Sequence, residues 1–331
     1  MNFAIAIDRN FIIQACTLIK SLELTQKENS VVFILNDDLT PKDFELMKNQ
    51  FNQNKIELFF LHAKLDNFDL NIENKVHLSK ATYFRLYLTE LLPRNIERII
   101  YLDCDMIVLK DLSELYNTDF NNKSCCAVID MFNNSKEIYT RLDYPRDSGY
   151  FNSGLLLINI PQWKKEKISE KALNFIQNNP ERCIAHDQDA LNKAISGNFI
   201  KLSVSYNMQL DFFRDFTNSI LNEEYYDDIS TAVKQPYIIH FTGPTKPWFK
   251  NCLHPYKKHW CFFCSKTIWK NNKSKYFFET PIKKLNFIIK IFCKTIHFYS
   301  FKKSFTKEAY SYANLSYKNL ERNYEKNNYK W

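Results

Sequence analysis

Two aspartates lie two residues apart in the stretch YLDCDMIV, which closes a largely apolar run that begins at Ile96. If this run is a strand, Asp103 and Asp105 point to the same side of it, because alternate side chains of a strand share a face. Two neighbouring carboxylates repel each other, and their burial is costly unless a cation neutralises them. A hard divalent cation with oxygen ligands would do so. An acidic turn at a strand end is the alternative, and the pair alone does not decide between them.

The surrounding segments predict the elements that position this pair. Short apolar runs at 3–7, 31–37 and 55–61 predict strands, and the segments 11–24 and 41–51 predict helices between them. Strands that alternate with helices predict an α/β fold in which a parallel sheet carries helices on both faces. In such sheets, ligands bind at the carboxyl ends of the strands, near a topological switch point.

Polar residues follow several of the predicted strands, and we expect them to gather at that edge. Those that follow strands in the first half of the chain are Asp8, Asn10, Asp103, Asp105 and Asp130. Four later or intervening motifs add amides, charges and glycines: ATYFRLYL with Tyr83 and Arg85, FNSG with Asn152, Ser153 and Gly154, HDQD with Asp187, Gln188 and Asp189, and HFTGPTKPW with His240, Gly243 and Lys246.

In their residues and their order along the chain, these motifs resemble those of the family 8 glycosyltransferases over roughly the first 260 residues. This family includes bacterial lipopolysaccharide and lipooligosaccharide hexosyltransferases and, more distantly, glycogenin. The resemblance implies a GT-A fold, which is a Rossmann-like nucleotide-binding α/β domain with a mostly parallel sheet. It also implies a retaining enzyme that transfers galactose or glucose from a UDP-sugar.

The resemblance implies a metal centre at Asp103, Asp105 and His240. Two carboxylates and a neutral imidazole suit Mn²⁺ better than Mg²⁺, because imidazole is a softer donor than water or a carbonyl, although Mg²⁺ remains an alternative. The ion would bridge the diphosphate and stabilise UDP as it departs.

The resemblance also implies a set of nucleotide-sugar contacts. Asp8 and Asn10 would contact the uracil and ribose, while Lys246 and the backbone around Gly243 would hold the phosphates. The whole set is Ala6, Ile7, Asp8, Asn10, Arg85, Asp103, Asn152, Ser153, Asp187, Gln188, Gly243 and Lys246.

The catalytic residues implied by the resemblance are Gln188, Asp187 and Asp130. Gln188 would lie at the sugar face where a covalent route needs a nucleophile, and an amide is a poor one. We therefore favour same-face attack by the acceptor hydroxyl through an oxocarbenium-like state, in which the departing phosphate takes the proton. A covalent glycosyl adduct on Gln188 or Asp187 would contradict this hypothesis.

Each of these residues also has a purely structural alternative. Asp8 and Asp187 could cap helices, Arg85 could pair with an acidic neighbour, and His240 could be a hydrogen-bonded core histidine. A further group could bind zinc or simply fill the core: Cys252, His254, His259, Cys261 and Cys264.

Positive charge is concentrated towards the C-terminus. The net charge is +8, but 15 basic and 4 acidic residues lie from Ser265 onward, which leaves 30 basic and 33 acidic residues before it. Between Ile282 and Tyr299, apolar residues recur at steps of three and four with lysines opposite them, which predicts a basic amphipathic helix. We therefore predict a catalytic domain at 1–265 and a membrane-associating tail at 266–331 that binds an anionic membrane surface. A core-packing helix is the alternative, and nucleic-acid binding is disfavoured because the charge is confined to the tail.

The predicted location is the cytoplasm, with peripheral attachment to the inner membrane. The 9 cysteines are odd in number and lie mostly in apolar segments, which favours a reducing compartment. The sequence shows no signal-peptide pattern and no uncharged run of about 18 apolar residues.

The predicted partners are a UDP-hexose donor and a lipid-linked oligosaccharide acceptor of the lipopolysaccharide or lipooligosaccharide core. The alternatives are a glycogenin-like or protein-directed transferase and a non-catalytic UDP-sugar-binding protein. A sugar-nucleotide pyrophosphorylase would need a glycine-rich loop after the first strand, and AIDRNF has none. No motif decides between galactose and glucose.

Overall fold

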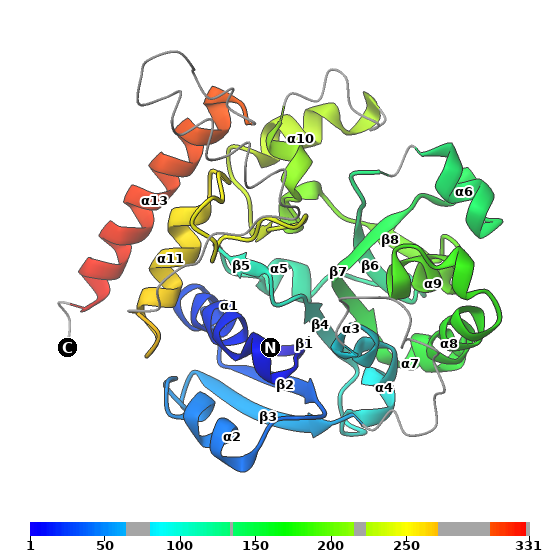
Figure 1. The fold of residues 1–331 in the computed structure, drawn as a ribbon, viewed down its shortest axis with the longest axis horizontal. Coiled ribbons are helices and arrows are strands. Elements are labelled where there is room, and N and C mark those ends of the chain that lie inside the picture. Colours follow the sequence, from blue (N-terminus) through cyan, green and yellow to red (C-terminus); the bar gives the residue numbers. More distant parts are fainter. Residues whose placement is uncertain (64–79, 133–134, 215–222, 271–304, 329–331) are drawn as a thin grey trace.

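The computed structural model describes residues 1–63, 80–132, 135–214, 223–270 and 305–328 (Figure 1). Its strands are β1 (Asn2–Ala6), β2 (Ser30–Asn36), β3 (Ile56–His62), β4 (Arg98–Leu102), β5 (Met106–Val108), β6 (Cys125–Ile129), β7 (Phe151–Asn159), β8 (Phe199–Lys201) and β9 (Ile238–His240). Its α-helices are α1 (Ile12–Thr25), α2 (Pro41–Lys48), α3 (Ala81–Phe84), α4 (Leu88–Leu91), α5 (Ser113–Tyr116), α6 (Lys136–Leu142), α7 (Ile160–Lys165), α8 (Ile168–Asn178), α9 (His186–Ile195), α10 (Tyr226–Ala232), α11 (Lys257–Ser265) and α13 (Lys307–Asn328).

A seven-stranded sheet in the order β3-β2-β1-β4-β7-β6-β8 forms the centre of the molecule. Strands β3, β2, β1 and β4 are parallel, and β6 pairs in parallel with β8, whereas β7 is antiparallel to both of its neighbours, β4 and β6. The predicted mostly parallel sheet is therefore confirmed. Because β7 is reversed, its first residues lie at the same edge as the carboxyl ends of β1, β4 and β6.

Two apolar cores enclose this sheet. On β1, Phe3 and Ile5 face the core shared with α1 and α11, whereas Ala4 faces the core shared with α3, α4, α7, α8 and α9. A strand that is buried on both faces appears in the sequence as a continuous apolar run, which explains the pattern of the first predicted strand. The layers of helix, sheet and helix confirm the predicted α/β architecture.

Local signals set the ends of the helices near the site. Helix α2 begins at Pro41 after Thr40, and the side chains of Thr40 and Asp43 each accept a hydrogen bond from the other residue's backbone N–H. Helix α9 ends at Ile195 and is followed by Gly197 at φ +78°, a conformation that favours glycine. Pro41 and Gly197 therefore mark the start of α2 and the end of α9.

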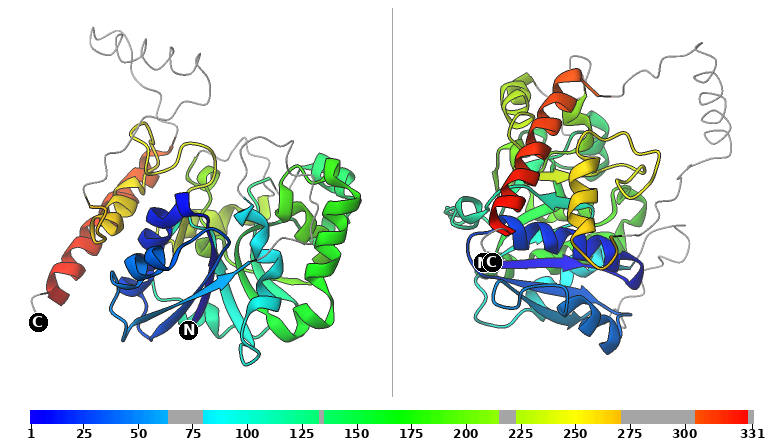
Figure 2. Two further views of the ribbon diagram at one scale, coloured as in Figure 1. Left: turned by 60° about the horizontal axis from the view of Figure 1, so that its bottom comes forward. Right: turned by 90° about the vertical axis from the view of Figure 1, so that its left-hand side faces the viewer.

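Helix α13 lies alongside α11, which in turn contacts α1 (Figures 1 and 2). Ala309 and Ala313 of α13 are almost fully buried in the main core, and the ring of Tyr317 packs edge-on against Phe262 of α11. The predicted amphipathic helix at 282–299 lies outside the described residues. Within the described ranges, every helix is too short or too polar to cross a membrane.

We expect Ala313→Glu to destabilise the protein, because it places an unpaired charge in the contact between α13 and the core. Burying such a group costs at least about 1–3 kcal/mol. Asn314→Glu is the matched control, since Asn314 is the next residue on the same helix and is exposed. Thermal unfolding should show a lower Tm for the Ala313 variant only. Equal Tm values for both variants would contradict the docking of α13.

Candidate active site

A cavity of about 330 Å³ opens at the sheet edge where the polar residues gather. This volume lies in the range of pockets that bind small molecules. The sequence-predicted residues that line it are Ala6, Ile7, Asp8, Arg85, Asp103, Asp105, Ser153, Asp187, Gln188 and Lys246. They come from the end of β1 and the loop after it, from the segment between α3 and α4, from the turn after β4, and from β7, α9 and the loop after β9.

Four predicted residues of the nucleotide-sugar or catalytic set do not line this cavity in the described structure. Asp130 and Asn152 lie behind its wall, where each is hydrogen-bonded to Gln188 at 3.1 Å. Asn10 is exposed, and Gly243 lies in the loop after β9 at φ +81°. Asp130 and Asn152 are therefore connected to the cavity by their hydrogen bonds to Gln188, which lines it. Asn10 and Gly243 are not among the described residues that line the cavity.

The two aspartates of YLDCDMIV converge through a turn and not along a strand. β4 ends at Leu102 and β5 begins at Met106, and the N–H of Met106 donates to the carbonyl of Asp103 at 3.2 Å. The N–H of Asp103 also donates to the carbonyl of Gly154 at 2.9 Å. The expectation that one strand carries both carboxylates is therefore wrong, because the chain leaves β7 after Asp103 and pairs with β9 from Met106 onward.

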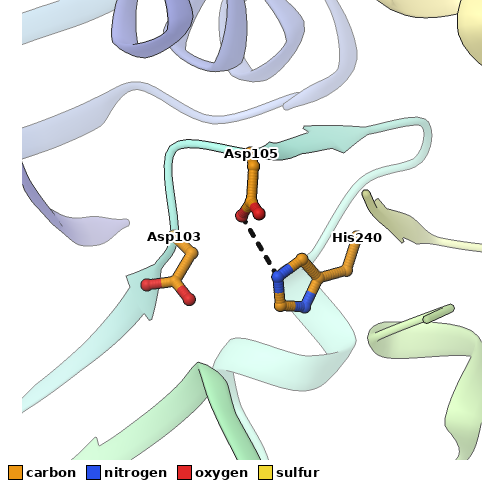
Figure 3. Close-up of side chains that lie close together, drawn as sticks. All are labelled: Asp103, Asp105 and His240. Carbon is orange, nitrogen blue, oxygen red and sulfur yellow. Dashed lines mark ion pairs between the residues drawn. The ribbon is translucent and has the colours of Figure 1, made fainter. Parts of the chain in front are cut away.

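Asp103, Asp105 and His240 point toward a common space (Figure 3). One possible ligand atom from each lies within 4.8 Å of the others. β5 and β9 pair antiparallel with Met106 opposite His240, which brings the imidazole to the turn. The Nε2 atom of His240 lies 3.1 Å from Oδ1 of Asp105. These three side chains could hold a divalent cation.

Gly154 keeps the space between these ligands open. A Cβ atom at this position would lie 2.5 Å from Cε1 of His240 and 2.8 Å from Oδ2 of Asp103, both far inside contact distance. Two carboxylates and one imidazole nitrogen suit a divalent metal such as Mn²⁺. The residues present therefore fit the group that the sequence predicts.

Lys246 neutralises part of the negative charge of this centre. Its Nζ lies 2.6 Å from Oδ2 of Asp105 and also donates to the carbonyl of Phe241 at 2.8 Å. Burial alone would raise the pKa of the Asp105 carboxyl, but Lys246 and His240 together hold it well below its usual range. Asp105 is therefore ionised at neutral pH and available as a ligand.

Arg85 joins the metal centre to the DQD motif. Its Nη2 lies 2.7 Å from Oδ1 of Asp103, its Nε lies 2.9 Å from Oδ2 of Asp187, and its Nη1 donates to the carbonyl of Ser153 at 2.7 Å. The guanidinium also stacks on Tyr101, 4.5 Å from the ring centroid. Since Arg85 is buried, removing one partner from these pairs would cost about 3–5 kcal/mol. Oδ1 of Asp103 is thereby fixed, which leaves Oδ2 as the oxygen for a ligand.

Four hydrogen bonds fix the amide of Gln188. Its Nε2 donates to Asp130 and to the hydroxyl of Tyr150, both at 3.1 Å. Its Oε1 accepts from the side chain of Asn152 and from the backbone N–H of Ser153, also at 3.1 Å. Gln188 is therefore a fixed, uncharged wall of the cavity.

Sequence reasoning missed Phe11 and Tyr101. Phe11 lines the cavity beside Asp8, is 36% exposed, and contacts Trp248 edge-on at 6.3 Å between ring centroids. Tyr101 lies under Arg85 and donates from its hydroxyl to Asp103 at 3.2 Å. Tyr101 lies in YLDCDMIV, and Phe11 directly follows AIDRN. The sequence alone does not tell whether an aromatic residue in an apolar run is exposed or which side chain it stacks on.

The structural alternatives hold for some of the same side chains. Asp8 accepts from the N–H of Asn10 and so caps the short 3-10 helix Arg9–Phe11. Arg85 pairs with acidic neighbours, and His240 is 4% exposed and hydrogen-bonded. Asp187 lies in the first turn of α9, whose N-cap is Ala185. These structural contacts do not remove the residues from the site. Asp8, Arg85 and Asp187 line the cavity, and His240 lies with the possible metal ligands.

The cysteine and histidine group after the KPW motif does not form a metal site in the described part of the chain. There, Asp103, Asp105 and His240 are the only such group whose ligand atoms converge. His254 lies among the rings of Phe213, Phe241 and Phe305, and burial lowers its pKa to about 3. His254 is a neutral residue of an aromatic cluster.

The chain matches one known protein family over most of its length. The model described as glycosyl transferase family 8 matches residues 2–252. The chain belongs to this family. It is therefore a glycosyltransferase, as the motifs predicted.

Three similar proteins illustrate this membership. General stress protein A of Bacillus subtilis (strain 168) is 28% identical over 251 residues, which cover 74% of this chain and 86% of that protein. Lipopolysaccharide 1,2-glucosyltransferase of Escherichia coli (strain K12) is 26% identical over 277 residues, covering 83% and 80%. The crystal structure of galactosyltransferase LgtC with donor and acceptor sugar analogues superposes with a TM-score of 0.73 at 23% identity, covering 82% of this chain and 99% of that one. The last comparison shows a common fold, GT-A.

We expect Gly154→Ala to weaken the binding of a divalent cation by at least about 10-fold, because the new Cβ displaces His240 or Asp103. Titration of the metal-free protein with Mn²⁺, followed by the electron paramagnetic resonance of the free ion, measures this affinity.

Gly149→Ala is the control for the Gly154 variant. Gly149 has φ +73°, so alanine strains the backbone there, but its new Cβ meets Lys201 and Phe199 and not the metal ligands. The control should lose stability and keep its Mn²⁺ affinity. Unchanged Mn²⁺ affinity in Gly154→Ala would contradict the proposed geometry.

Proposed function

We propose that the protein is a retaining hexosyltransferase that transfers galactose or glucose from a UDP-sugar, with Mn²⁺ as its cofactor. The observation that carries this proposal is the joint placement of Asp103, Asp105 and His240 beside a cavity that Asp187 and Gln188 also line. A cation site next to hydroxyl-binding groups is what a sugar diphosphate requires. The family membership and the GT-A fold support the same conclusion.

The nucleotide would bind at the side of the cavity formed by the loop after β1. Phe11 is partly exposed there and offers a ring for the uracil, while Asp8 offers a carboxylate to its polar edge or to the ribose. Lys246 lies on the metal side, where its ammonium can pass from Asp105 to a phosphate oxygen. Asn10 and Gly243 belong to the proposed set through the sequence motifs.

A divalent cation held by Asp103, Asp105 and His240 would bind the diphosphate and act as the Lewis acid that stabilises UDP as a leaving group. Arg85 keeps Asp103 oriented for this task through its ion pair. Lys246 would add a second positive charge near the developing phosphate charge.

The sugar would lie against Asp187 and Gln188. Ser153 lines the cavity, and Asn152 and Asp130 hold Gln188 in place. Because its amide is neutral and fixed by four hydrogen bonds, Gln188 is poorly suited to form a covalent adduct. This arrangement favours same-face attack by the acceptor hydroxyl, in which the departing phosphate accepts the proton.

The proposed acceptor is a lipid-linked oligosaccharide of the lipopolysaccharide or lipooligosaccharide core. The names of relatives such as the lipopolysaccharide 1,2-glucosyltransferase support this acceptor class. We propose a catalytic domain at 1–265 and a tail at 266–331, with residues 282–299 contacting an anionic membrane surface from the cytoplasmic side. Helix α13 packs on the core and is not part of the proposed membrane contact. That contact would come from residues 282–299, where lysines are interspersed among apolar residues.

We expect the purified protein to hydrolyse UDP-galactose or UDP-glucose slowly with Mn²⁺ and not with EDTA. Asp103→Asn should reduce UDP release by at least about 100-fold, because it removes a charged ligand near the leaving group. Glu114→Gln, at an exposed acidic residue away from the cavity, is the matched control. UDP release that is indifferent to EDTA, or absent with both sugars, would contradict the metal or the donor assignment.

The sugar-dependent part of donor affinity should fall as the pH drops through about 6. Burial raises the pKa of Asp187 to about 6, against the lowering effect of Arg85 and with a further raising effect of Asp103. Above this pH the carboxylate is charged and can accept from a sugar hydroxyl, and below it the group is protonated and its pairing with Arg85 weakens. The ratio of Kd for UDP to Kd for the UDP-sugar, measured with Mn²⁺ from pH 5 to 8, isolates this effect from metal binding. A constant ratio would contradict the role of Asp187.

A further inference from the structure

A buried amide, Asn207, lies directly behind the proposed metal ligand His240. It is 0% exposed, and its Oδ1 lies 2.9 Å from Nδ1 of His240. Its Nδ2 donates to Oδ1 of Asn152 at 2.9 Å. The N–H of Gly154 donates to the same oxygen of Asn152 at 3.1 Å.

A backbone N–H determines the orientation of this chain of amides. The N–H of Gly154 can only donate, so the atom of Asn152 that it meets is the oxygen. The atom of Asn207 that faces this oxygen must then be the NH₂ group, and Oδ1 of Asn207 is left to face His240. Because Oδ1 can only accept, Nδ1 of His240 carries a hydrogen.

This hydrogen decides which atom of the imidazole can bind a metal. A neutral imidazole with hydrogen on Nδ1 has its lone pair on Nε2. Nε2 is the atom that lies 3.1 Å from Oδ1 of Asp105, in the space between the proposed ligands. In the opposite tautomer, Nε2–H would donate to Asp105 and the lone pair would point away from that space.

We infer that Asn207 is a positioning residue that selects the tautomer of His240 able to bind a divalent cation. The inference rests on the proposed metal centre and adds a residue outside every motif of the sequence. Hydrogen-bonded partners behind a metal-binding histidine commonly change metal affinity by about 10- to 100-fold when they are replaced.

The fold holds Asn207 in place through backbone contacts and not through its side chain alone. Met208 forms a parallel bridge with Ile239, the N–H of Met208 donates to the carbonyl of Ile238, and the N–H of His240 donates to the carbonyl of Met208, both at 3.0 Å. The segment that carries Asn207 is therefore fixed beside β9 independently of the amide. A substitution of the side chain can leave this pairing intact.

The first measurement is Mn²⁺ affinity, obtained from the electron paramagnetic resonance of the free ion with no nucleotide present. Asn207→Leu keeps similar volume and removes both hydrogen bonds, and we expect it to bind Mn²⁺ about 10- to 100-fold more weakly than the wild type. Asn207→Asp keeps an acceptor for Nδ1–H, so its affinity should lie closer to that of the wild type. Asn207→Ala replaces the leucine variant if that protein does not fold.

Gln209→Leu is the matched control. Gln209 is also a 0% exposed amide two residues further on, but it donates to the carbonyl of Ile129 at 2.8 Å and accepts from the N–H of Met131 at 2.9 Å. These side-chain bonds go to β6 and to the residues after it, and neither goes to His240. This control should lose stability as Asn207→Leu does and retain the Mn²⁺ affinity of the wild type.

The second measurement reads the tautomer directly. Long-range ¹H–¹⁵N spectra of metal-free protein with ¹⁵N-labelled histidine distinguish hydrogen on Nδ1 from hydrogen on Nε2, and His240→Gln assigns the signal. We expect hydrogen on Nδ1 in the wild type and in Asn207→Asp, whether or not Nε2 also carries hydrogen toward Asp105, and loss of the hydrogen from Nδ1 in Asn207→Leu. A loss of packing alone would not remove this hydrogen.

The outcomes separate the inference from the proposed function. Equal Mn²⁺ affinity in the wild type and His240→Gln would overturn the metal centre and the role of Asn207 with it. A loss in His240→Gln but wild-type affinity in Asn207→Leu, or Nδ1–H in that variant, would overturn the role of Asn207 alone. Weaker binding with loss of the hydrogen from Nδ1 supports it.

Discussion

The crowding of one buried and two partly buried carboxylates at one sheet edge is the constraint that shapes the whole site. Asp103, Asp105 and Asp187 all line one cavity, and the cations that pair with them are Arg85 and Lys246. Uncompensated charges of this kind would cost more than a fold can sustain, since the net stability of a domain is only about 5–15 kcal/mol. The site is therefore stable without ligands because each carboxylate has a protein partner, and it retains an excess of negative charge that suits a divalent cation.

The reversed strand β7 turns this local chemistry into one connected site. Its first residues reach the edge at which β1, β4 and β6 end, so that Asn152 and Gly154 stand between the metal ligands and the DQD motif. Gly154 leaves the space that His240 and Asp103 need, while Asn152 bonds both to Asn207 and to Gln188. One strand end thus fixes the position of the metal ligands relative to the sugar-facing amide.

The fold class and the convergence of motifs were predictable from the sequence, because apolar runs and motif order are one-dimensional patterns. The reason for the convergence of Asp103 and Asp105 was not predictable, since the chain turns away from β7 after Asp103 and pairs with β9, a partner far along the sequence. Asn207 has no motif around it, and its function depends on contacts with residues far from it in the sequence. Long-range pairing of this kind cannot be read from local spacing.

The central claim is that Asp103, Asp105 and His240 form the cation site of a UDP-sugar transferase. Crystals grown with Mn²⁺ and UDP, measured at the manganese absorption edge, test it most directly. We expect an anomalous peak bounded by these three side chains, with the diphosphate beside it and the Nζ atom of Lys246 moved from Asp105 to a phosphate oxygen. An ordered UDP with no peak at the triad, or a peak bound to other residues, would contradict the account.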